Sequence, residues 1–235
     1  TSGYTSLVNR LLATSVHFIS SVQGLNLSNN SAALPFATSP PRPQAAATPC
    51  PKIGSNGSFK TVDGALEGSL NLSVDFGTTG CTPKDVKEGL LFGKIDIDLN
   101  SEKAAGDWTF RYEGFKVINK SAQIVVGADG SITVAWVGKA IPLMAGSNGA
   151  PSDMITTLDL KGVDSGREVS VKGESVFKQK TSSIFDFTQD MQVAVSGITH
   201  LLKGSSLQEI QAGKLISITP LGTPEVQEGE EAKLK

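Results

Sequence analysis

The 235-residue sequence lacks any strong excess of charge of one sign. Its 21 lysines and arginines nearly cancel its 23 aspartates and glutamates, which leaves a formal net charge of −2. A dedicated nucleic-acid surface normally needs a clear basic excess to neutralise phosphates. A polybasic membrane anchor needs a similar cluster of cations. The composition therefore argues against both, and we expect no nucleic-acid partner.

Long hydrophobic runs are also missing. No stretch of 18 or more apolar residues occurs, so the sequence predicts no transmembrane helix. The apolar stretch near the N-terminus is broken by Arg10, His17 and several serines, and it is therefore not an intact secretory signal. A cleaved signal would leave no trace, so export with the signal removed stays compatible with this pattern.

Residues that usually carry catalysis are scarce. The two histidines, His17 and His200, stand far apart in the chain, and no nucleophile-elbow sequence is present. Metal sites need closely spaced cysteine or histidine pairs, which are also missing. We therefore expect a protein that is not an enzyme and holds neither a metal nor a cofactor.

Only two cysteines are present, Cys50 and Cys81, and each lies beside proline or glycine in a stretch typical of a loop or strand end. A disulfide between them is the favoured interpretation, with two unrelated free thiols as the alternative. Such a bond would indicate an oxidising compartment, such as the periplasm, the outer membrane or the extracellular space.

What the sequence does contain is alternation of apolar and polar residues from residue 58 onward. The clearest example is LEGSLNLSVDF, in which the apolar residues Leu66, Leu70, Leu72, Val74 and Phe76 share one parity. LFGKIDIDLN repeats the pattern, with Lys94, Asp96 and Asp98 on the polar parity. Successive side chains of a strand point to opposite faces, so each segment predicts a half-buried strand.

About ten such strands are predicted, and their clean alternation favours antiparallel pairing. The parity shifts at Gly114, which is typical of a β-bulge. Ala128-Asp129-Gly130 stands between two β-branched runs and predicts a hairpin turn. The expected fold class is all-β, mainly antiparallel, with an N-terminal amphipathic helix. The pattern leaves a sandwich, a barrel and a single curved sheet all open.

Four regions are expected along the chain. An N-terminal helical segment covers 1–30, with its helical period at 5–23, and a proline-rich linker follows at 31–57. The β domain is expected at 58–220, although ITHLLKGSSLQEIQAG reads as a short helix or an irregular hairpin, and MAGSNGAPSD reads as a loop. The charged tail at 221–235 is expected to be disordered.

Several side chains could carry a function. Asp96 and Asp98 fall on one strand face, where a carboxylate pair could bind calcium or act on a glycoside, but a solvated polar face is the favoured interpretation. Trp108, Tyr112 and Trp136 could line a ligand pocket or stack against sugars, although core packing is favoured because they fall on the apolar parity. An Arg111–Glu113 ion pair is also conceivable.

The segment VDFGTTGCTPKDVKEGLLFGKIDIDL resembles stretches of uncharacterised bacterial exported proteins and lipoproteins. In these, a strand that ends near a cysteine is followed by a turn and by an alternating strand. The resemblance covers about 40 residues and implies an envelope protein, with no catalytic residue to carry over.

Two functional hypotheses follow. The first is a non-enzymatic exported or cell-envelope protein that acts by binding or scaffolding through its sheet surface and loops. The second is a carrier that holds an apolar, lipid-like ligand between a curved sheet and the N-terminal helix. A carbohydrate-binding or adhesin module that uses exposed aromatic residues is a third, weaker option.

Overall fold

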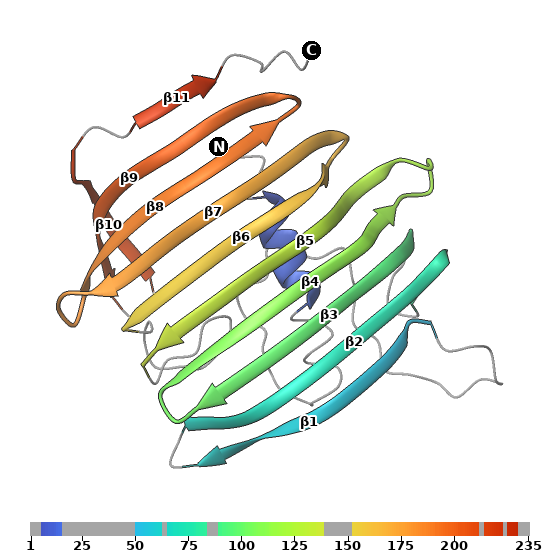
Figure 1. Cartoon of the computed structure of the whole chain (residues 1–235), viewed down its shortest axis with the longest axis horizontal. Helices are drawn as coiled ribbons and strands as arrows, with labels where there is room; N and C mark the ends of the chain where they lie inside the picture. The colour runs from blue at the N-terminus through green and yellow to red at the C-terminus, as the bar shows by residue number, and fades with distance from the viewer. Residues whose placement is uncertain are drawn as a thin grey trace.

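The computed structural model of the chain describes residues 6–15, 50–62, 65–83, 89–138, 152–211, 214–222 and 225–229. These residues form one helix, at 6–15, and a single open antiparallel sheet of eleven strands. The helix lies behind the middle of the sheet in the view of Figure 1. The predicted fold class is confirmed, and of the three geometries left open the single curved sheet is the one observed. None of the helical structure described is long and apolar enough to cross a membrane.

The strands follow one another along the sheet in chain order from β1 to β10. The exception is β11, which pairs with β9 beside the half of that strand that β10 leaves uncovered. The strands are β1 (Lys52–Val62), β2 (Ala65–Cys81), β3 (Leu90–Glu102), β4 (Ala105–Ile118), β5 (Ile124–Val137), β6 (Asp153–Asp164), β7 (Arg167–Gln179), β8 (Ile184–Val195), β9 (Ile198–Gln211), β10 (Lys214–Pro220) and β11 (Glu225–Gly229).

Short turns keep neighbouring strands in register. Ser165-Gly166 joins β6 to β7, and Ser196-Gly197 joins β8 to β9. Both residues of each pair have positive φ, as the two-residue hairpin turns that match the twist of a sheet require. Local connections of this kind explain how β1 to β10 follow one another as a meander.

Glycines inside strands bend the sheet. Gly130 in β5 and Gly173 in β7 have φ of 114° and 140°, which side-chain-bearing residues rarely adopt. A Cβ at Gly130 would collide with the backbone carbonyl of Asp159, and one at Gly173 with that of Asp190. Glycine kinks of this kind curve a sheet, and the long strands in Figure 1 are visibly bent.

The alternation predicted from the sequence separates the two faces of the sheet. One parity of the strands is buried and forms a continuous core with Leu7 and Leu11 of the helix. The sheet residues of this core come from eight strands, β2 to β9: Leu70, Leu72, Val74, Phe76, Leu91, Ile95, Ile97, Leu99, Trp108, Phe110, Tyr112, Phe115, Val126, Ala128, Ile132, Val134, Trp136, Leu158, Leu160, Val169, Val171, Met191, Val193 and Leu202.

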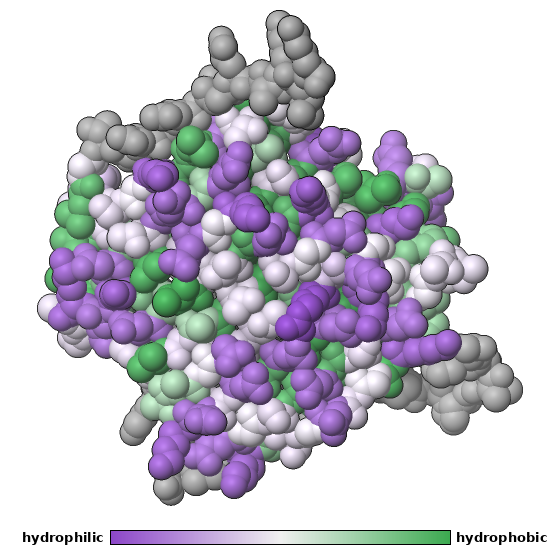
Figure 2. Space-filling view, viewed as in Figure 1, coloured by the Kyte–Doolittle hydropathy of each residue, from purple (hydrophilic) through white to green (hydrophobic). Residues whose placement is uncertain are grey.

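The opposite face of the sheet is mostly hydrophilic, as Figure 2 shows from the same viewpoint. Cross-strand ion pairs lie on it: Lys172 contacts Asp159 and Lys203 contacts Asp190. Each of these exposed pairs contributes under about 1 kcal/mol. This face of the sheet therefore contacts water, and the core on the opposite face stabilises the fold.

Four predictions made from the sequence need correction. The predicted hairpin at 128–130 is wrong, because β5 runs through these residues and Gly130 makes a kink within the strand. The segment read as a short helix or irregular hairpin is the long strand β9. The sheet begins at Lys52 rather than at residue 58, and the tail contains β11. β1 and β11 have no alternating apolar pattern that the sequence analysis could detect. They form strands because each pairs with a neighbouring strand.

Other predictions are confirmed or lie outside the described residues. The bulge at Gly114 is confirmed by a shift in the pairing of β4 with β5 between Tyr112 and Phe115. The predicted helix is confirmed at 6–15, and its remainder to residue 23 is outside the described residues. So are most of the proline-rich linker and all but the last two residues of the loop at 144–153.

The predicted disulfide is present between Cys50 and Cys81. It joins residues 31 positions apart and attaches the start of β1 to the end of β2. Replacing both cysteines by serine should lower the free energy of unfolding by about 3–4 kcal/mol, because the unfolded chain regains the entropy of a 31-residue loop. Urea unfolding of the oxidised protein and the double variant measures this difference. Two titratable thiols in the denatured, unreduced protein would contradict the bond.

Candidate functional site: the apolar face under the helix

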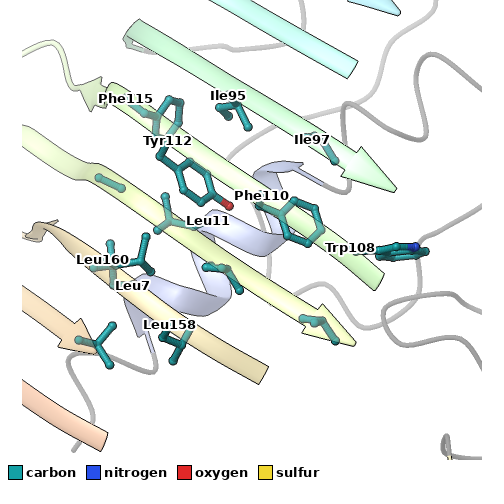
Figure 3. Packing of buried hydrophobic residues seen from close by; sticks show 14 of the residues in the cluster. Leu7, Leu11, Ile95, Ile97, Trp108, Phe110, Tyr112, Phe115, Leu158 and Leu160 are labelled. Carbon is teal, nitrogen blue, oxygen red and sulfur yellow. The ribbon is translucent and has the colours of Figure 1, made fainter. Parts of the chain in front are cut away.

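The helix contacts the sheet through one side. Leu7 and Leu11, one turn apart, are fully buried, and Val8 and Leu12 are partly buried against the same core. Asn9 is exposed. Figure 3 shows Leu7 and Leu11 between the helix and the middle strands, close to Leu160. Side chains four residues apart lie on the same face of a helix. The apolar face of this amphipathic helix is therefore the one that packs against the sheet.

Hydrogen bonds anchor the C-terminal turn of the helix. The Ser15 hydroxyl donates to the Leu11 carbonyl oxygen at 3.0 Å, and its oxygen lies 2.9 Å from the Tyr112 hydroxyl. A serine hydroxyl has one proton, so Tyr112 donates this second bond. Both side chains are buried, and the Tyr112 ring reaches from β4 to the helix in Figure 3. The bond therefore ties the helix to the centre of the sheet.

An ion pair holds the helix at a second point. Arg10 contacts Asp164, at the end of β6, with 3.2 Å between nitrogen and oxygen. The Asp164 side chain is only 8% exposed, whereas that of Arg10 is 43% exposed. The Ser165 hydroxyl also donates to Asp164. The helix is thus attached by separate polar contacts at Arg10 and Ser15, in addition to the buried Leu7 and Leu11.

Replacing Tyr112 by phenylalanine is expected to make the protein less sensitive to alkaline pH. Burial raises the pKa of Tyr112 far above its usual value. In the unfolded chain the phenol ionises near pH 10, so its contribution to stability is complete below about pH 10 and is lost as the pH rises further. Between pH 9 and 11 the unmodified protein should lose about 1 kcal/mol more unfolding free energy than the variant in urea titrations. Parallel losses would show that Tyr112 is not buried in this way.

The apolar face is much larger than the helix. A ten-residue helix is about 15 Å long and about 10 Å wide. Strands lie about 4.8 Å apart, so the eight strands that contribute to the core span about 34 Å. The described helix therefore covers only part of this face. The residues of this face that form the core are nevertheless at most 7% exposed in the structure.

Trp108 and Trp136 lie on this face beyond the helix. Their rings meet edge to face, with centroids 5.4 Å apart, and both are buried. In Figure 3, Phe110 lies nearer the helix on the same strand and Trp108 lies farther out. The Nε1 atom of Trp108 is shielded from solvent and has no hydrogen-bond partner among the residues that the structure describes. Buried donors are rarely left without an acceptor, so this group marks an unusual point in the core.

The structure places the three predicted aromatic residues on one face but brings only Trp108 and Trp136 into contact, whereas Tyr112 contacts Phe115 and Ser15. Trp108, Tyr112 and Trp136 lie on neighbouring strands of the buried face, so core packing is confirmed and none is exposed for stacking on sugars. Ser15, Arg10 and Asp164 were missed as contacts. Nothing in the local sequence indicates these contacts. Ser15 and Arg10 are ordinary polar residues of an amphipathic helix, and each binds a partner about 100 or more residues away along the chain.

The acidic residues on the polar face are engaged by neighbours. Asp96 contacts Lys94 at 2.7 Å, and Asp98 contacts both Arg111 and the Asn71 amide. The Arg111 hydrogen bond holds the pKa of Asp98 below its usual value, and the bond to Asp96 raises the pKa of Lys94. Arg111 therefore pairs with Asp98 rather than with Glu113. These contacts support the solvated-face interpretation, and the described residues hold no cluster suited to a metal ion.

No protein-family model, no curated protein and no solved structure matches this chain significantly. The resemblance to bacterial exported proteins and lipoproteins therefore stays a hypothesis.

Proposed function

We propose that the protein is a non-enzymatic, exported protein that binds an apolar, lipid-like ligand on the sheet face covered by the N-terminal helix. The observation that carries this proposal is the size of that face relative to its helix. Eight strands present one continuous apolar surface, and the described helix accounts for part of its cover.

Export and the lack of catalysis are parts of the proposal with separate support. The Cys50–Cys81 disulfide is compatible with an oxidising compartment. Asp96 and Asp98, which looked most like a catalytic pair, lie on the polar face of the sheet, opposite the face that buries the aromatic residues. Each is paired with a cationic neighbour. A sugar-binding module is less well supported, because its aromatic residues would have to be exposed.

Titration of the purified, delipidated full chain with a fluorescent long-chain acyl probe tests the proposal. We expect saturable binding of about one probe per chain and displacement by unlabelled mono-oleoylglycerol. Native mass spectrometry after gentle purification should show a lipid-sized adduct. A ligand-free mass together with no saturable probe binding would refute the proposal.

One substitution at two positions of β5 provides a matched control. Val134 is buried on the apolar face opposite Trp108, whereas Val137 is 52% exposed. If the ligand lies against this part of the face, Val134→Phe should weaken probe binding about tenfold, while the added bulk by itself should lower stability by about 1–3 kcal/mol. Val137→Phe should bind like the unmodified protein. Equal affinities in two folded variants would place the ligand elsewhere.

A further inference from the structure

The two ends of the sheet differ in the side chains that their edge strands present. β1 and β10 lie at opposite ends, and neither has a further strand partner among the described residues (Figure 1). β1 carries the exposed residues Lys52 and Lys60, and charges of this kind keep an edge strand from pairing with another molecule. Between Leu215 and Leu221 the β10 edge has no charged residue. β10 therefore lacks the protection that β1 has.

Large apolar side chains are concentrated at the β10 edge. Leu215, Ile216, Ile218 and Leu221 are each 44–55% exposed. The other exposed large hydrophobic residues of the described part are scattered singly over the sheet. Single exposed residues are normal on a protein surface, whereas an apolar cluster marks a site of interaction. On a strand with an unpaired backbone edge, the partner that fits is another strand.

The residue order of β10 favours a second copy of the same strand as that partner. Antiparallel pairing about a two-fold axis at Ser217 places Ile216 of each copy opposite Ile218 of the other. Directly opposed β-branched side chains stabilise such a pair. The same register places Lys214 opposite Pro220, so no like charges meet. The β10 edge is therefore complementary to itself, as a two-fold interface requires.

Other features limit this association to a weak pair of copies. A bulge between Leu215 and Ser217 and the proline at the end of β10 shorten the ladder that can form. The exposed centre of β1 reads GSNGS and offers no apolar match for continued growth at the other edge. The cluster leaves roughly 350 Å² accessible on each copy, compared with about 800 Å² per partner in a stable complex.

We infer that the protein forms a weak, two-fold symmetric dimer in which the β10 strands of two copies pair antiparallel and bury this apolar cluster. The dimer extends the sheet through its edge and does not use the helix. It is therefore independent of the proposed ligand binding.

Sedimentation equilibrium of the oxidised full chain tests the inference. The mass should rise from one chain to two between about 2 and 400 µM, as expected for an interface smaller than the standard size. Ile218→Lys should weaken the association about a hundredfold, because a two-fold interface loses the side chain twice. Ile155→Lys places the same charge at an exposed isoleucine of β6 and should associate like the unmodified protein.

A cysteine at the two-fold axis provides a second test. The two native cysteines are bonded to each other, so Ser217→Cys introduces a single free thiol. Directly opposed residues of antiparallel strands have Cα atoms about 4.5–5.5 Å apart, a distance that a disulfide can span. Mild oxidation should therefore link two copies at least about tenfold faster than in Thr157→Cys, whose residue is exposed on β6.

Several results would overturn the inference. A mass of one chain at every concentration would do so, and slow amide exchange in β10 of that monomer would assign the edge to another segment of the chain. Equal association of the two lysine variants would place any dimer contact elsewhere. So would equal cross-linking of the two cysteine variants, a comparison that stands even if circular dichroism shows Ile218→Lys to be unfolded.

Discussion

Replacing Leu11 by alanine is expected to lower the free energy of unfolding by about 2–5 kcal/mol, the range for removing a leucine side chain from a packed core. Leu11 is fully buried, and Figure 3 shows it between the helix and the middle of the sheet. The substitution keeps good helix propensity, so the loss comes from packing. Urea unfolding followed by circular dichroism measures it.

The matched control lies two residues away on the other side of the helix. Asn9 is exposed, and Asn9→Ala should change the stability by less than about 0.5 kcal/mol. Release of the helix in Leu11→Ala should also increase the binding of an apolar dye to the exposed sheet. Equal stabilities of the two variants would mean that the helix does not dock on the sheet.

Replacing Gly130 by alanine is expected to destabilise the protein by about 2–4 kcal/mol. The residue has a φ of 114°, a conformation that costs a side-chain-bearing residue about 1–3 kcal/mol. Its new Cβ would also collide with the backbone carbonyl of Asp159 on β6, which cannot move without disturbing the β5–β6 pairing. Thermal or urea unfolding measures the loss.

Gly54 is the matched control for this substitution. It lies in edge strand β1, has no positive φ, and a Cβ there would meet no atom of the described part of the chain within 4 Å. Gly54→Ala should therefore be neutral or slightly stabilising, since alanine loses less entropy on folding than glycine. If Gly130→Ala is as stable as Gly54→Ala, the glycine kink does not shape the sheet.

The alternating pattern predicted the central strands well, because a strand that is buried on one face has apolar residues at every second position. Leu70, Leu72 and Val74 had to share a face, and they are buried together. The edges of the sheet were less predictable. In β11 the residues Glu225–Gly229 carry two glutamates and one valine, and the strand forms because β9 presents unpaired backbone groups there.

The error at residues 128–130 has a similar origin. Asp129-Gly130 suits a hairpin turn by composition, since glycine tolerates positive φ. In the folded protein the same positive φ bends β5 without ending it, and the Asp129 carboxylate accepts a hydrogen bond from the backbone N–H of Gly114 at 2.6 Å. The local sequence is compatible with both, and pairing with β4 and β6 selects the continuous strand.

The candidate site was half predictable. Parity placed Trp108, Tyr112 and Trp136 on the buried face, and the helical period predicted an amphipathic segment that docks. The partners that join them, such as Ser15 with Tyr112, are separated by 97 positions and leave no local pattern. The unpartnered Nε1 of Trp108 emerges only when the whole core is assembled.

Amide hydrogen exchange with and without mono-oleoylglycerol tests the central claim, that ligand and helix share the apolar face. The claim predicts that saturating ligand slows exchange at residues 6–15 and along β4 and β5 more than along edge strand β1. Unchanged exchange in the helix and in these two strands, with the ligand demonstrably bound, would contradict it.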